Sequence, residues 1–204
     1  MPRHLKQRRV RLSRTILPVI GALLCAGCAT TTGRAPPPCR FNGVDDVSSA
    51  SVRESRRQLL TAQLLDLGVN VDPAEAHEVA ATALRTSLAQ RRDYGVTGGA
   101  TSHNLAILSG TKQRGLCIHW TRDLLDALRA LNLRTFSLYW GIANEGNVLS
   151  EHSTVVIAAR GAGFHDGLVL DGWRYSGCLH WGPVASDKYR WKEAAQYLRG
   201  DTAR

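Results

Sequence analysis

The hydrophobic period of the chain changes at Asn132, and this change limits the fold more than any other feature of the sequence. Upstream, residues 117–131 place apolar side chains on one helical face, with a period of about 3.6 residues. Downstream, residues 136–142 alternate apolar with polar or small side chains, as a half-buried strand does. Two further apolar runs, residues 152–159 and 168–173, have the length of strands. The sequence therefore predicts a change from helix to sheet near this point.

Two more helices are predicted in the N-terminal half. Residues 52–67 hold leucines at helical spacing. A second helix, over residues 73–92, begins after Asp72, an effective N-cap residue that a proline follows, and Glu75 is placed to reach back to the cap. A loop is expected over residues 96–104. Because the helices precede the strands, the predicted class is α+β, with N-terminal helices packed on an antiparallel sheet.

The first 27 residues have the pattern of a targeting segment. Six basic side chains and no acidic one precede an apolar run that is too short to span a bilayer. The run ends in LCAGC, residues 24–28, which resembles the signal of a bacterial lipoprotein, whose cysteine carries lipid and becomes the mature N-terminus. An ordinary secretory peptide cut nearby is the alternative. We therefore expect a signal peptide over residues 1–27, a tether rich in Thr, Gly and Pro over residues 28–46, and a folded domain over residues 47–204.

The lipoprotein resemblance implies a partner and a location. Cys28 would anchor the protein to a membrane, and Ala29 in place of an aspartate favours the outer membrane, with the domain facing the periplasm. The formal net charge of +9 does not indicate a nucleic-acid partner, because the leader holds six of the 26 basic residues and the remaining 20 are balanced by 17 acidic ones.

Three cysteines lie beyond the predicted lipid anchor: Cys39, Cys117 and Cys178. In an oxidising compartment, the simplest arrangement pairs Cys39 with Cys178 and leaves Cys117 free. The alternative is that Cys178 is a small packed residue. Both arrangements leave Cys117 as the thiol whose role must be explained.

Cys117, His152 and Asp171 together have the residue types of a nucleophilic thiol site. Cys117 begins its predicted helix, where unpaired N–H groups favour an anion. His152 opens one predicted strand and Asp171 lies on the next, so the two face each other directly if the turn is centred between residues 161 and 162. Residues 166–167 form a stronger turn dipeptide, which would shift that register. Cys117 also lies on the apolar stripe of its helix, so a buried structural cysteine remains the alternative.

These residues resemble the transglutaminase-like superfamily of papain-related thiol enzymes. The resemblance rests on Gly115-x-Cys117-x-x-Trp120 at a helix start, on the LRALNLR stretch that ends the helix, and on LDGW around Asp171. It implies a papain/transglutaminase-like core and acyl transfer from an amide or peptide through a thioester. The outcome would be hydrolysis or transfer to an amine, and the substrate would be an envelope protein or peptidoglycan.

The resemblance also assigns roles. Cys117 would attack the carbonyl carbon, His152 would take and return the proton, and Asp171 would orient the imidazole. The backbone N–H of Cys117 would hold the oxyanion, with Gln113 or Asn104 as the candidate second donor. No cofactor is expected, and no histidine or cysteine spacing indicates a metal site.

A second, non-enzymatic function stays open. The same fold would then serve as an envelope scaffold or binding module with an inactive triad. The family has an aromatic residue after the histidine, and this chain has Ser153 there.

Overall fold

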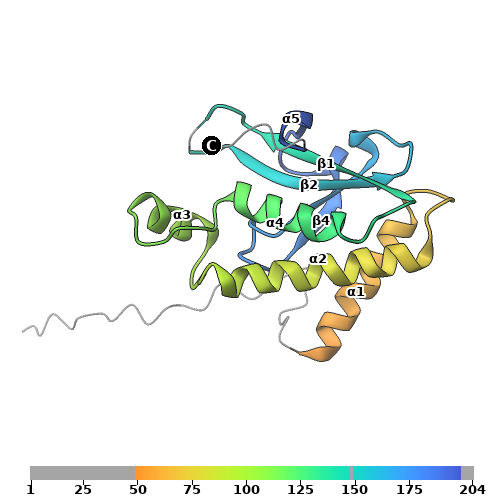
Figure 1. Cartoon of the computed structure of the whole chain (residues 1–204), viewed down its shortest axis with the longest axis horizontal. Helices are drawn as coiled ribbons and strands as arrows, with labels where there is room; N and C mark the ends of the chain where they lie inside the picture. The colour runs from red at the N-terminus through yellow and green to blue at the C-terminus, as the bar shows by residue number, and fades with distance from the viewer. Residues whose placement is uncertain (1–48, 148, 199–204) are drawn as a thin grey trace, which may run out of the picture. The chain divides into compact units, whose positions relative to one another are not determined.

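The computed structural model of the protein describes residues 49–147 and 149–198 (Figure 1). Helices come first along the chain and a five-stranded antiparallel sheet follows, which confirms the predicted α+β class. The predicted signal peptide and tether, with Cys28 and Cys39, lie outside the described residues.

The three strongly patterned helices lie close to where the sequence predicts them. They are α1 (Ala50–Leu65), α2 (Pro73–Asp93) and α4 (Cys117–Arg129). Asp72 caps α2 as expected, because its carboxylate accepts the N–H groups of Ala74 and Glu75 at 2.7 and 3.1 Å.

Glu75 corrects the predicted capping box. Its carboxylate does not return to the helix cap but accepts the backbone N–H groups of Arg134 and Thr135, both at 2.8 Å, and the Thr135 hydroxyl at 2.7 Å. Burial opposes ionisation of this group, but the hydrogen bonds from Thr135 and Arg134 lower the pKa of Glu75 to about 2. Glu75 thus joins the start of α2 to the start of the first strand.

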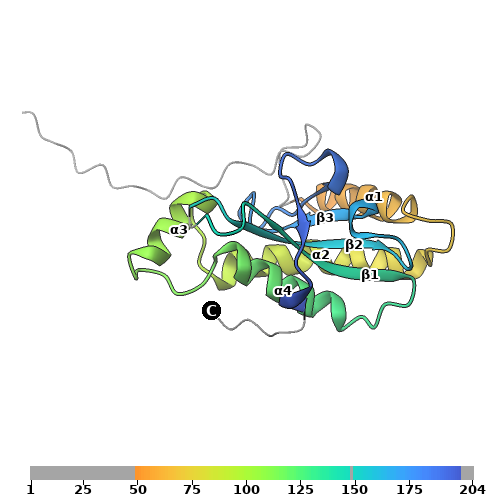
Figure 2. The same cartoon turned by 90° about the horizontal axis from the view of Figure 1, so that it is seen from above.

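The expected loop over residues 96–104 is also corrected. Residues Ala100–Leu108 form a helix, α3, which includes the short apolar piece at residues 105–108. His103 is its one buried residue, while Leu105 and Leu108 are exposed. The helix has no buried apolar stripe, so the hydrophobic period that reveals α2 and α4 is missing here. Figures 1 and 2 both place α3 at one end of the molecule, on the side where α4 begins.

The sheet has the strand order β4-β3-β2-β1-β5. Its strands are β1 (Phe136–Ala143), β2 (His152–Ala159), β3 (Leu168–Asp171), β4 (His180–Pro183) and β5 (Lys192–Glu193). A short helix, α5 (Ala195–Leu198), follows β5. The sequence does not predict β4 and β5, which have four and two residues and carry too little period to be recognised.

Apolar side chains cover both faces of the sheet. On one face, Val155 and Ile157 of β2 join the main core with leucines of α1, α2 and α4. On the other face, Val156 and Val169 pack with Trp191 from the C-terminal segment. Because side chains alternate along a strand, His152 and Asp171 belong to the second face, with Val156 and Val169.

The register of β2 and β3, which the sequence left open, does not place His152 directly opposite Asp171. Val155 pairs with Leu170 and Val156 with Val169, so Asp171 continues the ladder opposite Thr154 rather than His152. The shift is two residues, and a shift of two keeps the same face of the sheet. Residues 164–166 form a single helical turn between the strands, and this connection moves the centre of the hairpin by one residue. His152 and Asp171 are therefore diagonal neighbours on one face.

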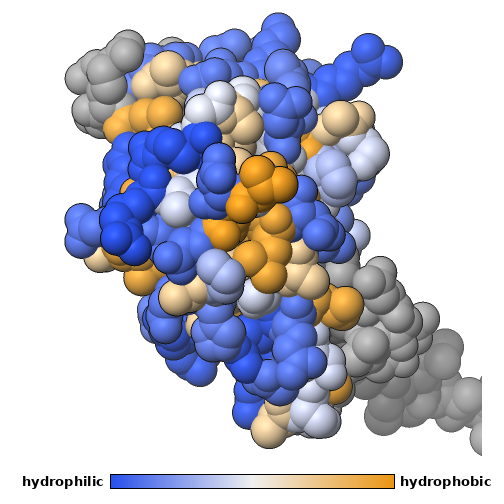
Figure 3. All heavy atoms as spheres, turned by 90° about the vertical axis from the view of Figure 1, so that its right-hand side faces the viewer, coloured by the Kyte–Doolittle hydropathy of each residue, from blue (hydrophilic) through white to orange (hydrophobic). Residues whose placement is uncertain are grey.

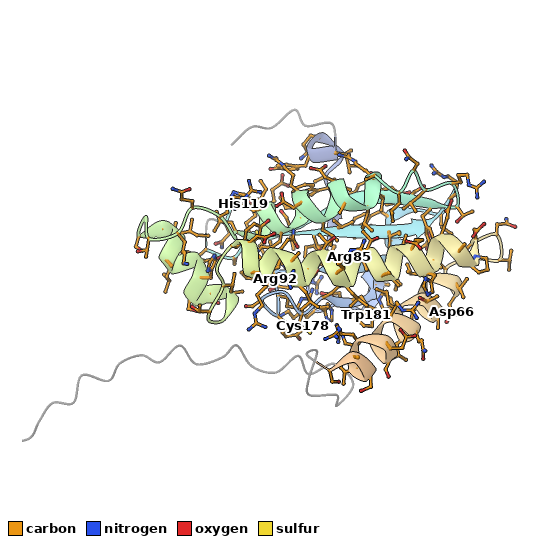
Figure 4. The ribbon with its side chains drawn as sticks, turned by 60° about the horizontal axis from the view of Figure 1, so that its bottom comes forward. Asp66, Arg85, Arg92, His119, Cys178 and Trp181 are labelled. Atoms are coloured by element: carbon orange, nitrogen blue, oxygen red, sulfur yellow. The ribbon has the colours of Figure 1, made fainter. Side chains whose placement is uncertain are left out.

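Two surface features lie away from this face. A cavity of about 430 Å³ lies between α1, α2 and residues 177–179, and Figure 4 shows Arg85, Arg92 and Cys178 among its lining residues. At the end of the molecule shown in Figure 3, apolar side chains gather in a patch between polar ones. The α1–α2 connection carries a fully exposed valine, Val69.

Candidate active site

The start of α4 presents the free thiol of the described residues. Cys117 is the first residue of α4 and is partly exposed to solvent. Its sulfur lies 3.8 Å from the carbonyl oxygen of Glu151, the residue that precedes His152. The start of the helix and the start of β2 are therefore in contact, and the thiol lies where they meet.

His152 and Asp171 form a buried hydrogen-bonded pair. Nε2 of His152 lies 2.7 Å from Oδ2 of Asp171, and both side chains are at most 2% exposed. The other ring nitrogen, Nδ1, is buried and has no regular hydrogen-bond partner. Cys117 is the further group whose hydrogen bonding and charge act on this ring. The structure thus brings together the three residues that the sequence singles out, with a 2.7 Å contact between His152 and Asp171 and with Cys117 near enough to act on the ring.

The environment of His152 favours its protonated form. Burial alone lowers the pKa of an imidazole, but the charge and hydrogen bond of Asp171, together with those of Cys117, raise the pKa of His152 to about 9. The same pair acts on the carboxyl group. Burial favours its neutral form, but the positive charges of His152 and Arg174 hold the pKa of Asp171 below its ordinary value. An imidazolium–carboxylate pair is therefore the favoured state at neutral pH.

Arg174 connects Asp171 to a second buried carboxylate. Its Nε donates to Oδ2 of Asp171 at 2.9 Å, its backbone N–H donates to Oδ1, and its other guanidinium nitrogens contact both oxygens of Asp187 at 3.0 and 3.1 Å. Asp187 also lies 3.2 Å from Nε2 of His180. Arg174 and Asp187 are not predicted from the sequence. The one local signal for Arg174 is its position three residues after Asp171, an aspartate at the end of an apolar strand. An aspartate and an arginine at this spacing are also common on protein surfaces, so the pattern does not identify a buried ion pair.

Three aromatic rings enclose the imidazole. The ring centroids of Trp173, Tyr189 and Trp191 lie 4.5, 4.9 and 5.3 Å from that of His152. Tyr189 and Trp191 come from the C-terminal segment, so this segment completes the wall of the site. The rings exclude water from His152, and electrostatic interactions are stronger where water is excluded.

The two candidate oxyanion donors lie in different surroundings. Asn104, on α3, accepts the indole N–H of Trp173 through Oδ1 at 3.2 Å, so its amide is fixed beside the aromatic wall. Gln113 is exposed on the segment before α4. Of the two, Asn104 is the one whose amide contacts a side chain of the aromatic wall.

The remaining cysteine predictions are only partly within the described residues. Cys178 is buried and disulfide-bonded. Its partner lies outside the described residues, as Cys39 does, so the pairing of Cys39 with Cys178 stays a prediction.

Comparisons with known proteins provide no relative. No family model, no curated protein and no solved structure matches this chain. Among residues 49–147 and 149–198, no cluster of three or more His, Cys, Asp and Glu side chains is placed to hold a metal ion. Over the same residues, no helix has both the length and the apolar character needed to cross a bilayer.

Proposed function

We propose that this protein is an exported thiol enzyme that cleaves or transfers acyl groups of amide or peptide bonds, with Cys117, His152 and Asp171 as its catalytic residues. The observation that carries the proposal is that the two ring nitrogens of His152 have different surroundings. Asp171 takes Nε2 at 2.7 Å, and the buried Nδ1 has no regular hydrogen-bond partner, while Cys117 acts on the same ring. A buried nitrogen without a partner lowers stability, and proton exchange with a neighbouring thiol gives it a function.

The chemistry follows from these positions. His152 holds the thiol proton as an imidazolium, and the sulfur of Cys117 attacks the carbonyl carbon of an amide. When the tetrahedral intermediate collapses, the C–N bond breaks and His152 gives its proton to the departing amine. Water or a second amine then attacks the thioester and gives its proton to His152, and the C–S bond breaks to release the sulfur. Hydrolysis and transfer differ only in this second nucleophile.

The start of α4 supports the charged intermediate. The N–H groups of Cys117 and Ile118, in the first turn, have no partner among the described residues. These N–H groups and the positive end of the helix macrodipole stabilise negative charge. In the proposed reaction they stabilise the carbonyl oxygen as it becomes negatively charged.

The same arrangement of a helix-start cysteine with a histidine and an aspartate on adjacent strands supports a papain/transglutaminase-like core. The proposal includes the lipid anchor on Cys28, the outer-membrane location and an envelope protein or peptidoglycan substrate, all of which rest on the sequence pattern of the leader and on the family resemblance.

Alkylation of Cys117 tests the proposal. Iodoacetamide at pH 6 should modify Cys117 at least 10-fold faster than it modifies free cysteine, because an imidazolium neighbour favours the thiolate. His152→Gln should remove most of this advantage, and peptide mass spectrometry identifies the modified residue. Ser109→Ala, a change at an exposed hydroxyl after α3, is the control variant. Wild-type Cys117 that reacts no faster than free cysteine would leave the scaffold function as the better explanation.

A further inference from the structure

Three side chains with ring nitrogens bind the backbone of residues 114–116, the segment that precedes Cys117. Nε2 of His103 lies 2.8 Å from the carbonyl oxygen of Arg114. The indole N–H of Trp120 donates to the carbonyl oxygen of Gly115 at 2.9 Å. On the opposite side of the chain, Nδ1 of His119 accepts the backbone N–H groups of Gly115 and Leu116 at 3.1 and 3.2 Å. His119 is the one of the three that binds N–H groups, and Figure 4 shows it near the start of α4.

His119 replaces a conventional N-cap. Leu116 is the N-cap residue of α4 and has no side-chain acceptor, so the usual Ser, Thr, Asp or Asn cap is missing. His119, at the third helical position, reaches back as a Glu or Gln does in a capping box. Two N–H groups are thereby bound, and the N–H groups of Cys117 and Ile118 are left pointing from the helix start.

Only a neutral His119 ring can accept the N–H groups of Gly115 and Leu116, because a protonated ring has no lone pair at Nδ1. The surroundings favour the neutral form. Burial and the positive charges of Arg114 and Arg122 lower the pKa of His119, against the opposing charge of Asp123. Arg114 belongs to the held segment and the other two charged groups to α4, while His103, from α3, binds the carbonyl oxygen on the other side of the segment.

We propose that His119 is a positioning residue: its neutral ring fixes Gly115 and Leu116 so that the N–H group of Cys117 points at the oxygen of the tetrahedral intermediate. The catalytic part of this inference rests on the proposed function. Loss of the His119 bonds should impair steps in which negative charge develops on a carbonyl oxygen. Simple alkylation of the thiol develops no such charge and should be spared.

Two reagents separate these steps. Wild-type protein, His119→Ala and His119→Asn are each treated with p-nitrophenyl acetate, which acylates a thiol through a tetrahedral oxyanion, and with iodoacetamide, which does not. Asn is the matched variant because its Oδ1 can occupy the position of Nδ1 and accept the same two N–H groups without titrating. We expect His119→Ala to acylate at least 10-fold more slowly and to alkylate within about 2-fold of wild type, since removing one oxyanion donor costs about 10²–10³ in rate. His119→Asn should restore acylation and should lose less of it than wild type as the pH falls below 6.5.

Amide hydrogen exchange provides a readout that does not depend on activity. The amides of Gly115 and Leu116 should be protected in wild type and in His119→Asn and should exchange at least 10-fold faster in His119→Ala. Unchanged protection in His119→Ala, or equal loss of acylation and alkylation, would overturn the role of His119. Wild-type protein that reacts with neither reagent at Cys117 would instead refute the proposed function, together with the catalytic part of this inference, while the exchange data still decide whether His119 holds the segment.

Discussion

Replacement of Arg174 by methionine tests the buried ion network behind the candidate active site. The guanidinium makes three side-chain contacts of 2.9–3.1 Å with Asp171 and Asp187, and all three side chains are at most 4% exposed. Methionine keeps much of the volume but leaves two buried carboxylates without their shared cation. Removing one member of a buried ion pair costs about 3–5 kcal/mol, so we expect a loss of that size in the free energy of unfolding.

Urea unfolding at pH 7 measures this loss, with Arg174→Lys as the conservative comparison. Lysine keeps the charge but cannot contact both carboxylates with a planar fork, so an intermediate loss is expected. The double variant Arg174→Met/Asp187→Asn removes one of the stranded charges and should recover part of the stability. Measured together with the single variant Asp187→Asn, it completes a double-mutant cycle that gives the coupling energy for the pair. A loss below about 1 kcal/mol for Arg174→Met would show that the Arg174 contacts contribute no more than a surface salt bridge does.

Three further predictions concern other parts of the chain. Glu75→Gln should lower the free energy of unfolding by about 1–3 kcal/mol at pH 7, because several donors lose a charged acceptor. Since the pKa of Glu75 falls from 4.5 to about 2 on folding, this contribution is present above pH 4.5 and is lost as the pH falls toward 2. The same dependence of stability on pH in both proteins would exclude it. Gly115→Ala should slow acylation of Cys117 by p-nitrophenyl acetate and lower stability, because Gly115 has φ +122° and an added Cβ would lie 2.3 Å from Nε2 of His103. Unchanged acylation would show that the segment accommodates the added methyl group. Cys28→Ser should abolish labelling of the protein by radioactive palmitate in cells, and persistent labelling would rule out the predicted anchor.

The sequence predicts the elements that have a repeated apolar pattern. The stripe behind Cys117 locates α4, and the alternation in residues 136–142 locates β1, because burial on a regular element leaves a periodic trace. The helix α3 leaves no such trace, since His103 is its single buried residue. The strands β4 and β5 are too short to show one.

In the candidate site too, features that depend on local sequence could be predicted, and contacts between distant segments could not. The helix start marks Cys117, and the strand pattern places His152 and Asp171 on neighbouring strands. Their register depends on the geometry of the connection, which the sequence leaves open between two turns. The contacts of Arg174 with Asp187 and of Glu75 with Thr135 could not be assigned, because each joins separate segments and no local pattern requires it. Long-range polar contacts of this kind become visible only in three dimensions.

In the proposed site, the His152 ring interacts with Cys117 and with Asp171 at the same time. An NMR titration of the imidazole measures this coupling. We predict a pKa of about 9 for His152 in the wild type, and lower values in both Cys117→Ala and Asp171→Asn, since each partner raises it. Because this pKa lies above the ordinary 6.5, the pairing stabilises the fold fully below pH 6.5 and ceases to do so as the pH rises through about 9. A His152 that titrates near 6.5, or whose pKa is unaffected by loss of the Cys117 thiol, would contradict this coupling and the proposed triad.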